Sequence, residues 1–159
     1  MRDTEVAKGM SPKIKAMPAL LIAGLKLRTN GPEELPTLWQ RFSRYFGEIP
    51  TQVGSEAFGV IYNFSAAGFD YLAGVRVSSL NDVSSELAHI DIPAQRYATF
   101  AHEGHVRNLS RTIDAIWKNW QPAWGRPAGA HVQTIERYGE HFDPQAGSGD
   151  IEVWIPIEN

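Results

Sequence analysis

The sequence predicts an α+β fold built from a duplicated strand-helix-strand-strand unit. Each half of the chain shows an apolar segment, an amphipathic segment and two alternating segments, in that order. The 159 residues suit one domain. We expect this domain to cover residues 1–159, with repeat 1 at about 13–80 and repeat 2 at about 90–158. The expected sheet is pseudo-twofold and mostly antiparallel, with both helices on one face and a ligand cleft between the repeats.

The first unit opens with a buried strand and an amphipathic helix. Residues 19–27 form an apolar run typical of a buried strand. Glu33 and Glu34 favour the start of a helix, because acidic side chains complement the positive end of the helix dipole. The helix is expected to run to about Phe46. One helical stripe carries its apolar residues, which are Leu35, Leu38, Trp39, Phe42 and Phe46.

A hairpin completes the first unit, and the second half repeats the order. Residues 58–64 and 70–78 predict two strands joined by a short turn at 66–68. The second half then offers a strand at 96–101, a helical stripe of Leu109, Ile113, Ile116, Trp117 and Trp120, and strands at 132–138 and 151–157. A non-duplicated α+β sheet is the alternative.

Superposition of the two halves supports the duplication. The stripe Leu35, Leu38, Trp39 and Phe42 falls on Ile113, Ile116, Trp117 and Trp120 at an offset of 78. With small loop adjustments, Tyr62 falls on Tyr138 at an offset of 76, and 75–77 fall on 155–157 at an offset of 80. The repeat is therefore expected to extend through the hairpins.

Composition excludes several classes of partner and chemistry. The net charge of −3 and the pI near 5.9 argue against direct nucleic-acid binding, which needs basic side chains to neutralise phosphates. Without cysteine there are no disulfides and no thiolate sites, which suits a reducing compartment. The N-terminus shows no secretory signal, and the longest apolar run is far too short to cross a membrane. We expect a cytoplasmic monomer or small homo-oligomer without a membrane partner.

Metal ions and cofactors are not expected either. His102 and His105 flank Gly104 in a strand-to-helix turn, and no aspartate or cysteine completes a zinc pattern. The chain shows no nucleophile elbow and no glycine-rich phosphate loop. Nucleotide chemistry is therefore not indicated.

Glu136 is the main candidate for a functional residue. Strand alternation places Val132, Thr134, Glu136 and Tyr138 on one face. In the last strand, Val153, Ile155 and Ile157 suit the helix-packed side, so Glu152 and Trp154 are expected to share the opposite face with Glu136 and Tyr138. A carboxylate among aromatic rings attracts a ligand cation. The alternative is a structural ion pair of Glu136 with Arg137, Arg76 or Lys118.

The high aromatic content suggests that some rings contact ligand. Five Trp, five Tyr and seven Phe exceed what one modest core usually requires. Besides Glu136, the expected ligand-binding residues are Tyr138, Trp154, Tyr62, Tyr71, Phe58, Trp39 and His102. Trp117 and Trp120 are assigned to the core.

Five segments carry a resemblance to a known family: 71–75 (YLAGV), 92–98 (IPAQRYA), 100–104 (FAHEG), 135–138 (IERY) and 151–157 (IEVWIPI). They resemble the GyrI-like superfamily, the AraC-type effector-binding domains. The resemblance implies a duplicated fold that binds lipophilic, aromatic or cationic small molecules, drugs and toxins among them, between its repeats. It also implies a place for His102 in the family's His-x-Gly turn near the cleft.

The resemblance leaves three functions open. Several members are effector halves of transcription regulators, but about twelve residues before the first strand cannot hold a helix-turn-helix, so we expect a free-standing domain. Such a domain is a small-molecule-binding protein, a contact modulator of a partner such as DNA gyrase, or a hydrolase of cyclopropane-bearing alkylating toxins. In the hydrolase, Glu136 acts as general base and Tyr71 or Tyr138 polarises the substrate oxygen. The binding function is favoured.

Overall fold

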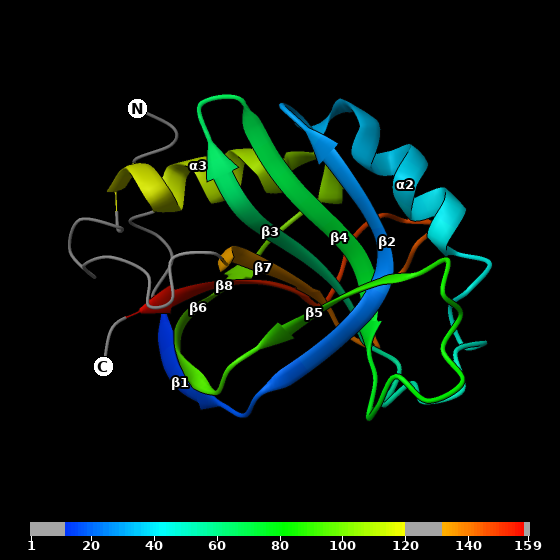
Figure 1. Ribbon diagram of the computed structural model, residues 1–159. Helices are drawn as coiled ribbons and strands as arrows, with labels where there is room; N and C mark the ends of the chain where they lie inside the picture. The colour runs from blue at the N-terminus through cyan, green and yellow to red at the C-terminus, as the bar shows by residue number, and fades with distance from the viewer. Residues whose placement is uncertain (1–11, 120–131, 158–159) are drawn as a thin grey trace.

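The structure is a computed structural model that describes residues 12–119 and 132–157 (Figure 1). Its strands are β1 (Lys13–Met17), β2 (Leu20–Thr29), β3 (Ala57–Ser65), β4 (Gly68–Arg76), β5 (Ala88–Ile92), β6 (Gln95–His102), β7 (Val132–Tyr138) and β8 (Ile151–Ile157). Its helices are α2 (Leu35–Phe42) and α3 (Leu109–Asn119), each preceded by a 3₁₀ turn, η1 (Pro32–Glu34) and η2 (Val106–Asn108).

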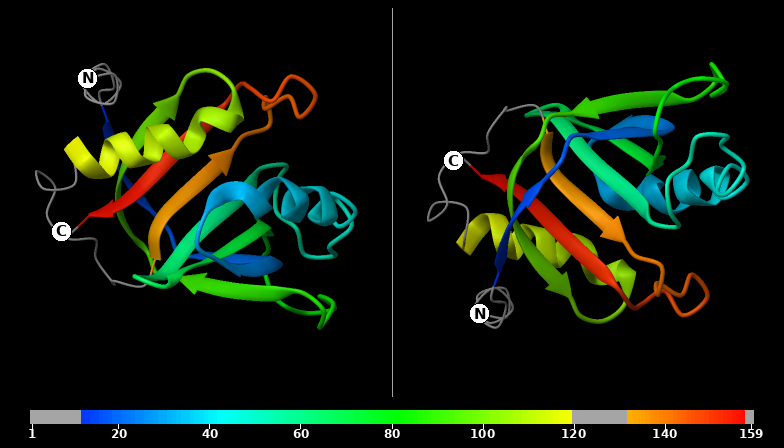
Figure 2. Two further views of the ribbon diagram at one scale, coloured as in Figure 1. Left: turned by 90° about the horizontal axis from the view of Figure 1, so that it is seen from above. Right: turned by 90° about the horizontal axis from the view of Figure 1, so that it is seen from below.

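All eight strands form one antiparallel sheet whose order displays the duplication. The order is β1-β6-β8-β7-β3-β4-β2-β5, so β7 and β3 lie at the centre and equivalent strands lie on either side. Both helices cover the same face of the sheet, and β7 runs between them when the molecule is seen from above (Figure 2, left). The predicted fold class, the repeat and the helix placement are confirmed.

Two edge strands, β1 and β5, were not expected from the sequence. β1 precedes β2 but pairs with β6 of the second repeat, and β5 precedes β6 but pairs with β2 of the first repeat. Pro18 and Pro93 lie at the two bends, each followed by alanine, and a proline suits such a bend because it donates no ladder hydrogen bond. Each half therefore contributes a strand to the other.

The first helix ends earlier than the sequence predicted. α2 stops at Phe42, and the amides of Tyr45, Phe46 and Glu48 each bond to the carbonyl three residues back. Such turns have about three residues each, so they rotate Phe46 off the α-helical stripe. Phe46 is consequently 41% exposed rather than buried. In the part of the chain that the structure describes, no helix has the length and apolar character needed to span a bilayer.

The core divides between the two faces of the sheet. Under α2 and α3 lie two apolar clusters, and Trp39 and Ile61 pack against both of them. The opposite face holds a third cluster, here called the opposite-face core, which contains Leu20, Ile22, Phe58, Val60, Tyr62, Leu72, Ile90, Ile92, Tyr97, Val132, Ile135 and Trp154. Figure 1 shows the strong curvature of the sheet, with β2 and β5 nearer to the viewer than β6 and β8.

Candidate functional site

Glu136 lies at the centre of the sheet, on the face that carries the helices. Its neighbours in register are Gly59 on β3 and Val153 on β8. Val153 belongs to the apolar cluster under α3, which fixes the face to which Glu136 points. The glutamate is only 4% exposed. A carboxyl group is thus buried at the seam between the repeats, below the space that separates α2 from α3.

Three side chains form a hydrogen-bond network around this carboxylate. The Tyr71 hydroxyl donates to Glu136 Oε1 at 2.6 Å, and the Tyr138 hydroxyl donates to the same oxygen at 2.9 Å. Trp39 Nε1 donates to the Tyr71 hydroxyl at 2.9 Å. Because these residues come from α2, β4 and β7, the network connects both repeats across the seam.

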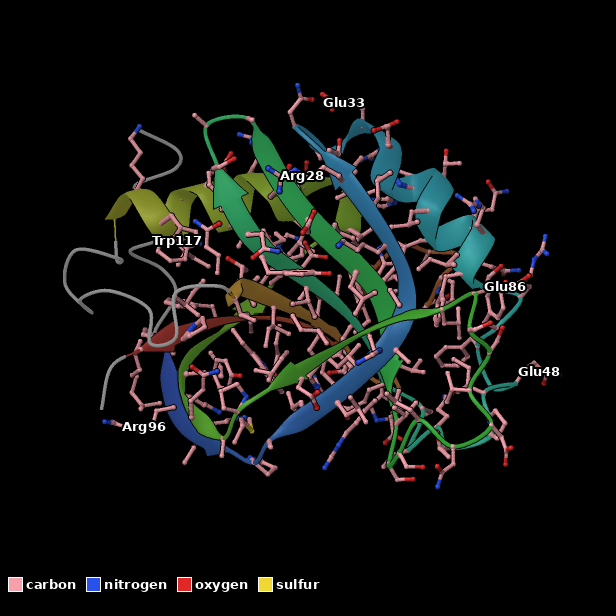
Figure 3. The ribbon with its side chains drawn as sticks, in the orientation of Figure 1. Arg28, Glu33, Glu48, Glu86, Arg96 and Trp117 are labelled. Atoms are coloured by element: carbon pink, nitrogen blue, oxygen red, sulfur yellow. The ribbon has the colours of Figure 1, made fainter. Side chains whose placement is uncertain are left out.

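Trp39 also covers the site with its ring. The indole packs edge-on against Tyr138, with centroids 5.3 Å apart, and against Tyr71 at 6.4 Å. It is only partly buried, unlike the two tyrosines. Trp117 on α3 donates to Thr134 Oγ1 at 2.9 Å and lies between its helix and the strands (Figure 3). These two repeat-related tryptophans, Trp39 and Trp117, border the seam.

The electrostatics of Glu136 reflect burial opposed by hydrogen bonds. Burial raises its pKa from 4.5 to about 6, although the hydroxyls of Tyr71 and Tyr138 favour the charged form. The pKa values of both tyrosines lie well above 10, because the rings are buried and the nearby Glu136 charge opposes ionisation. Both hydroxyls therefore remain protonated donors at physiological pH.

The ion-pair alternative for Glu136 is not supported. Arg137 lies on the opposite face, where it pairs with Glu56 at 2.6 Å, Asp150 at 3.3 Å and Glu152 at 3.4 Å. Within residues 12–119 and 132–157, no salt bridge reaches Glu136. The hydrogen bonds described for its carboxylate come from neutral hydroxyls.

The structure brings together four of the predicted ligand-binding residues and separates the others. Glu136, Tyr138, Tyr71 and Trp39 form the site. Trp154, Phe58 and Tyr62 belong to the opposite-face core. The expectation that Trp154 and Glu152 share a face with Glu136 is wrong, because Glu136 lies opposite Val153 while Trp154 lies opposite Ile135. A shift of one residue in register exchanges the two faces of a strand.

Shifts of one residue also explain why Tyr62 and Val132 lie on the face opposite to Glu136. The sequence superposition equated Tyr62 with Tyr138, yet Tyr138 packs under α3 and Tyr62 faces the other way. The β3–β7 pairing also shifts between Ile61 and Tyr62, which places Val132 in the opposite-face core rather than beside Glu136. The superposition is therefore wrong by one residue in this strand, and Tyr62 is not the structural counterpart of Tyr138.

His102 supports the start of the second helix rather than the candidate site. Its Nε2 lies 3.0 Å from the His105 carbonyl and its Nδ1 lies 2.9 Å from Thr112 Oγ1. A carbonyl only accepts, so Nε2 carries a proton, and in the neutral ring Nδ1 accepts from the threonine. Trp117 is partly buried against the cluster under α3, whereas Trp120 lies outside the described residues.

The carboxylate is closed off in this conformation. Two surface hollows, of about 390 and 350 Å³, lie elsewhere. The larger lies where β6 ends and β8 begins, beside Glu103 and Asp150, and the smaller lies beside Arg76 and Asp91. Neither includes Glu136, Tyr71 or Tyr138 in its lining. An open cleft over Glu136 thus requires one of the covering side chains to move.

Sequence reasoning missed Gly59, the cross-strand neighbour of Glu136. Its only visible signal was a glycine inside an alternating strand, which indicates a close approach of other atoms to the backbone.

The comparison with protein families decides the identity of this domain. Residues 10–158 match the family described as the GyrI-like small molecule binding domain. The chain belongs to this family. A curated relative, the transcriptional regulator BrlR of Pseudomonas aeruginosa, is 26% identical over 153 residues. The match covers 94% of this chain and 56% of BrlR, so the chain spans about half the length of that relative.

Solved structures share the GyrI-like fold at low sequence identity. SAV2435, solved with bound tetraphenylphosphonium, superposes with a TM-score of 0.78 at 16% identity, covering 94% of this chain and 95% of that one. A putative transcription regulation protein from Staphylococcus aureus MU50 gives 0.72 at 16% identity, covering 95% and 100%. The EcmrR C-terminal domain gives 0.68 at 14% identity, covering 94% and 98%. At these identities the likeness concerns the fold.

Proposed function

We propose that this GyrI-like domain binds lipophilic aromatic cations at the seam between α2 and α3, with Glu136 as their counter-charge. The observation that carries the proposal is a buried carboxylate held by neutral hydroxyls and surrounded by aromatic rings. Desolvating a carboxylate is costly unless charge or hydrogen bonds compensate for it. A cation brought to Glu136 supplies the missing charge, and the rings add cation-π attraction.

Ligand entry requires Trp39 to move in this proposal. Trp39 is the partly exposed member of the cluster, and its ring lies against both tyrosines that hold Glu136. Its indole already donates a hydrogen bond to the Tyr71 hydroxyl. An aromatic ligand that displaces this ring gains the same edge contacts with Tyr71 and Tyr138. The ring contacts that Trp39 makes with the two tyrosines are thus replaced rather than lost.

Two ions of the same shape and opposite charge test the proposal. Tetraphenylphosphonium is expected to bind with a micromolar Kd, roughly 6 to 8 kcal/mol, measured by calorimetry and by quenching of tryptophan fluorescence. Tetraphenylborate is expected to bind far more weakly, because the carboxylate repels it. Glu136→Gln should weaken phosphonium binding by about 10- to 100-fold, because the variant loses the charge–charge attraction to the cation.

The matched control is Glu152→Gln, which removes a carboxylate from the opposite face. This variant should bind tetraphenylphosphonium as the wild type does. Equal binding of both ions by the wild-type protein, or equal losses in the two variants, would contradict the proposal.

A second candidate function is hydrolysis of cyclopropane-bearing electrophiles. A carboxylate whose pKa lies near 6, flanked by protonated tyrosines, is suited to general-base catalysis near neutral pH. In this scheme Glu136 takes a proton from water, and the water oxygen bonds to a ring carbon. The strained carbon–carbon bond breaks, and its electron pair passes to a conjugated carbonyl oxygen that takes a proton from Tyr71. The proton on Glu136 then restores the tyrosine.

Turnover distinguishes the two functions. A cyclopropane conjugated with a carbonyl should be converted to a product heavier by one water, detected by mass spectrometry. Glu136→Gln should reduce this rate by about 10²- to 10⁴-fold. Equal consumption by the wild type and the variant, or consumption by neither, would exclude Glu136 as a base for that compound and leave binding as the function.

A further inference from the structure

Gly59 is the residue directly across the sheet from Glu136. In register it lies between Glu136 on β7 and Ala73 on β4. Tyr71 projects from β4, so its hydroxyl has to cross β3 to reach Glu136. Neighbouring strands lie about 4.8 Å apart, which places β4 and β7 about 10 Å from one another. The Tyr71 side chain spans this gap only by lying along the sheet, over β3.

The space for that crossing exists because residue 59 has no side chain. A Cβ built on Gly59 lies 2.6 Å from Glu136 Oε1 and 2.7 Å from Tyr71 Cζ, and closer still to the Tyr71 hydroxyl oxygen. Real Cβ atoms do not approach other atoms within 3.0 Å. Gly59 does not have a positive φ, so its backbone is one that alanine adopts freely. Steric space, rather than backbone conformation, therefore requires a glycine here.

We propose that Gly59 determines the cation selectivity of the site by leaving the space through which the Tyr71 hydroxyl reaches Glu136. This inference rests on the proposed binding function. The hydroxyl bond favours the ionised carboxylate, whereas burial favours the neutral acid. Loss of the bond leaves burial less opposed, so the pKa of Glu136 rises and more of the carboxyl is neutral at pH 7. A neutral acid no longer distinguishes a cation from an anion of the same shape.

Gly59→Ala tests the proposal in the absence of ligand. We expect the variant to titrate Glu136 at a higher pH than the wild type does, followed by ¹³C NMR of labelled glutamate δ-carbons and assigned with Glu136→Gln. Its affinity ratio for tetraphenylphosphonium over tetraphenylborate at pH 7 should fall by about 10-fold or more, the effect of one hydrogen bond to a charged group. The ratio should recover at higher pH, where Glu136 ionises again.

Two tyrosine variants show whether Gly59 acts through Tyr71. Tyr71→Phe removes the hydroxyl without adding bulk, so it should reproduce both effects even if Gly59→Ala folds poorly. Gly59→Ala added to Tyr71→Phe should then shift the titration little further. Tyr138→Phe is the matched control, because its hydroxyl is not among the atoms nearest to the added Cβ. Added to this control, Gly59→Ala should produce its full shift.

The possible failures are distinguishable. If the wild type prefers the phosphonium but the Glu136 titration is unchanged in Gly59→Ala, the Gly59 proposal is overturned and the binding function stands. A Gly59→Ala shift of equal size in the Tyr71→Phe and Tyr138→Phe backgrounds also overturns it. If the wild type does not distinguish the two ions, both the proposed function and the Gly59 proposal are wrong.

Discussion

Both faces of the sheet carry packed aromatic rings, but they differ in what the rings enclose. On the opposite face, Trp154 packs edge-on against Phe58 at 5.9 Å and tilted against Tyr97 at 5.5 Å. On the helix face, Trp39 packs against Tyr71 and Tyr138 at similar distances, but there the rings surround a carboxylate. Aromatic content alone therefore does not identify a binding site. The buried carboxylate of Glu136 is the feature that distinguishes the proposed site.

The curvature of the sheet explains the difference. The strands exchanged between the repeats, β1 and β5, curl around the opposite face and leave Trp154 and Tyr97 almost completely buried. The helix face is covered by two separate helices (Figure 2). The partly exposed Trp39 lies against Tyr71 and Tyr138 there. One face is a core enclosed by strands, and the other has a seam that a partly exposed side chain covers.

The largest expected effect is on the opposite face. Trp154→Ala should lower the free energy of unfolding by about 3 to 5 kcal/mol, because it leaves a large cavity in a packed core. Trp39→Ala should cost less, since Trp39 is partly exposed. Denaturant unfolding measures both. Tetraphenylphosphonium binding should change in Trp39→Ala and remain in the folded fraction of Trp154→Ala; the reverse pattern would assign the ligand to the opposite face.

A smaller effect is expected from the charge of Glu136. Its folded-state pKa of about 6 lies above the ordinary value of 4.5, so the folded state is penalised as pH rises from 4.5 through 6. Glu136→Gln removes this penalty. The variant should match the wild type below pH 4.5 and be about 2 kcal/mol more stable above pH 6, by thermal or denaturant unfolding. A variant that is less stable than the wild type at pH 7 would indicate a structural role for the charge.

The smallest effect compares one hydroxyl from each face. Tyr138→Phe removes a donor to the ionised carboxylate and should cost about 1.5 kcal/mol at pH 7, with a smaller cost at pH 4, where Glu136 is protonated. Tyr97→Phe is the control, because the Tyr97 hydroxyl accepts a hydrogen bond from the Gln95 amide at 3.2 Å, a group that does not titrate. Its cost should be lower and should not change between these pH values. Parallel pH dependence in both variants would contradict the assigned role of Tyr138.

Much of this architecture was predictable from the sequence because it depends on local patterns. The stripes of α2 and α3 follow helical periodicity, and the constant offset between them revealed the repeat. Glu136 and Tyr138 were identified together because residues two apart in a strand share a face. The exchanged strands β1 and β5 were not predictable from local pattern, because their partners lie in the other repeat and each strand is only five residues long.

The membership of the site was decided by tertiary structure. The register of β8 against β7 decides whether Trp154 lies on the same face as Glu136. A shift of one residue would move Trp154 to the other face. The local pattern of apolar residues fits either register, because both faces of this sheet are buried. The position of Gly59 was decided in the same way, since only the pairing of β3 with both β4 and β7 places it beneath Tyr71. The sequence determined which side chains were available, and strand pairing decided which of them meet.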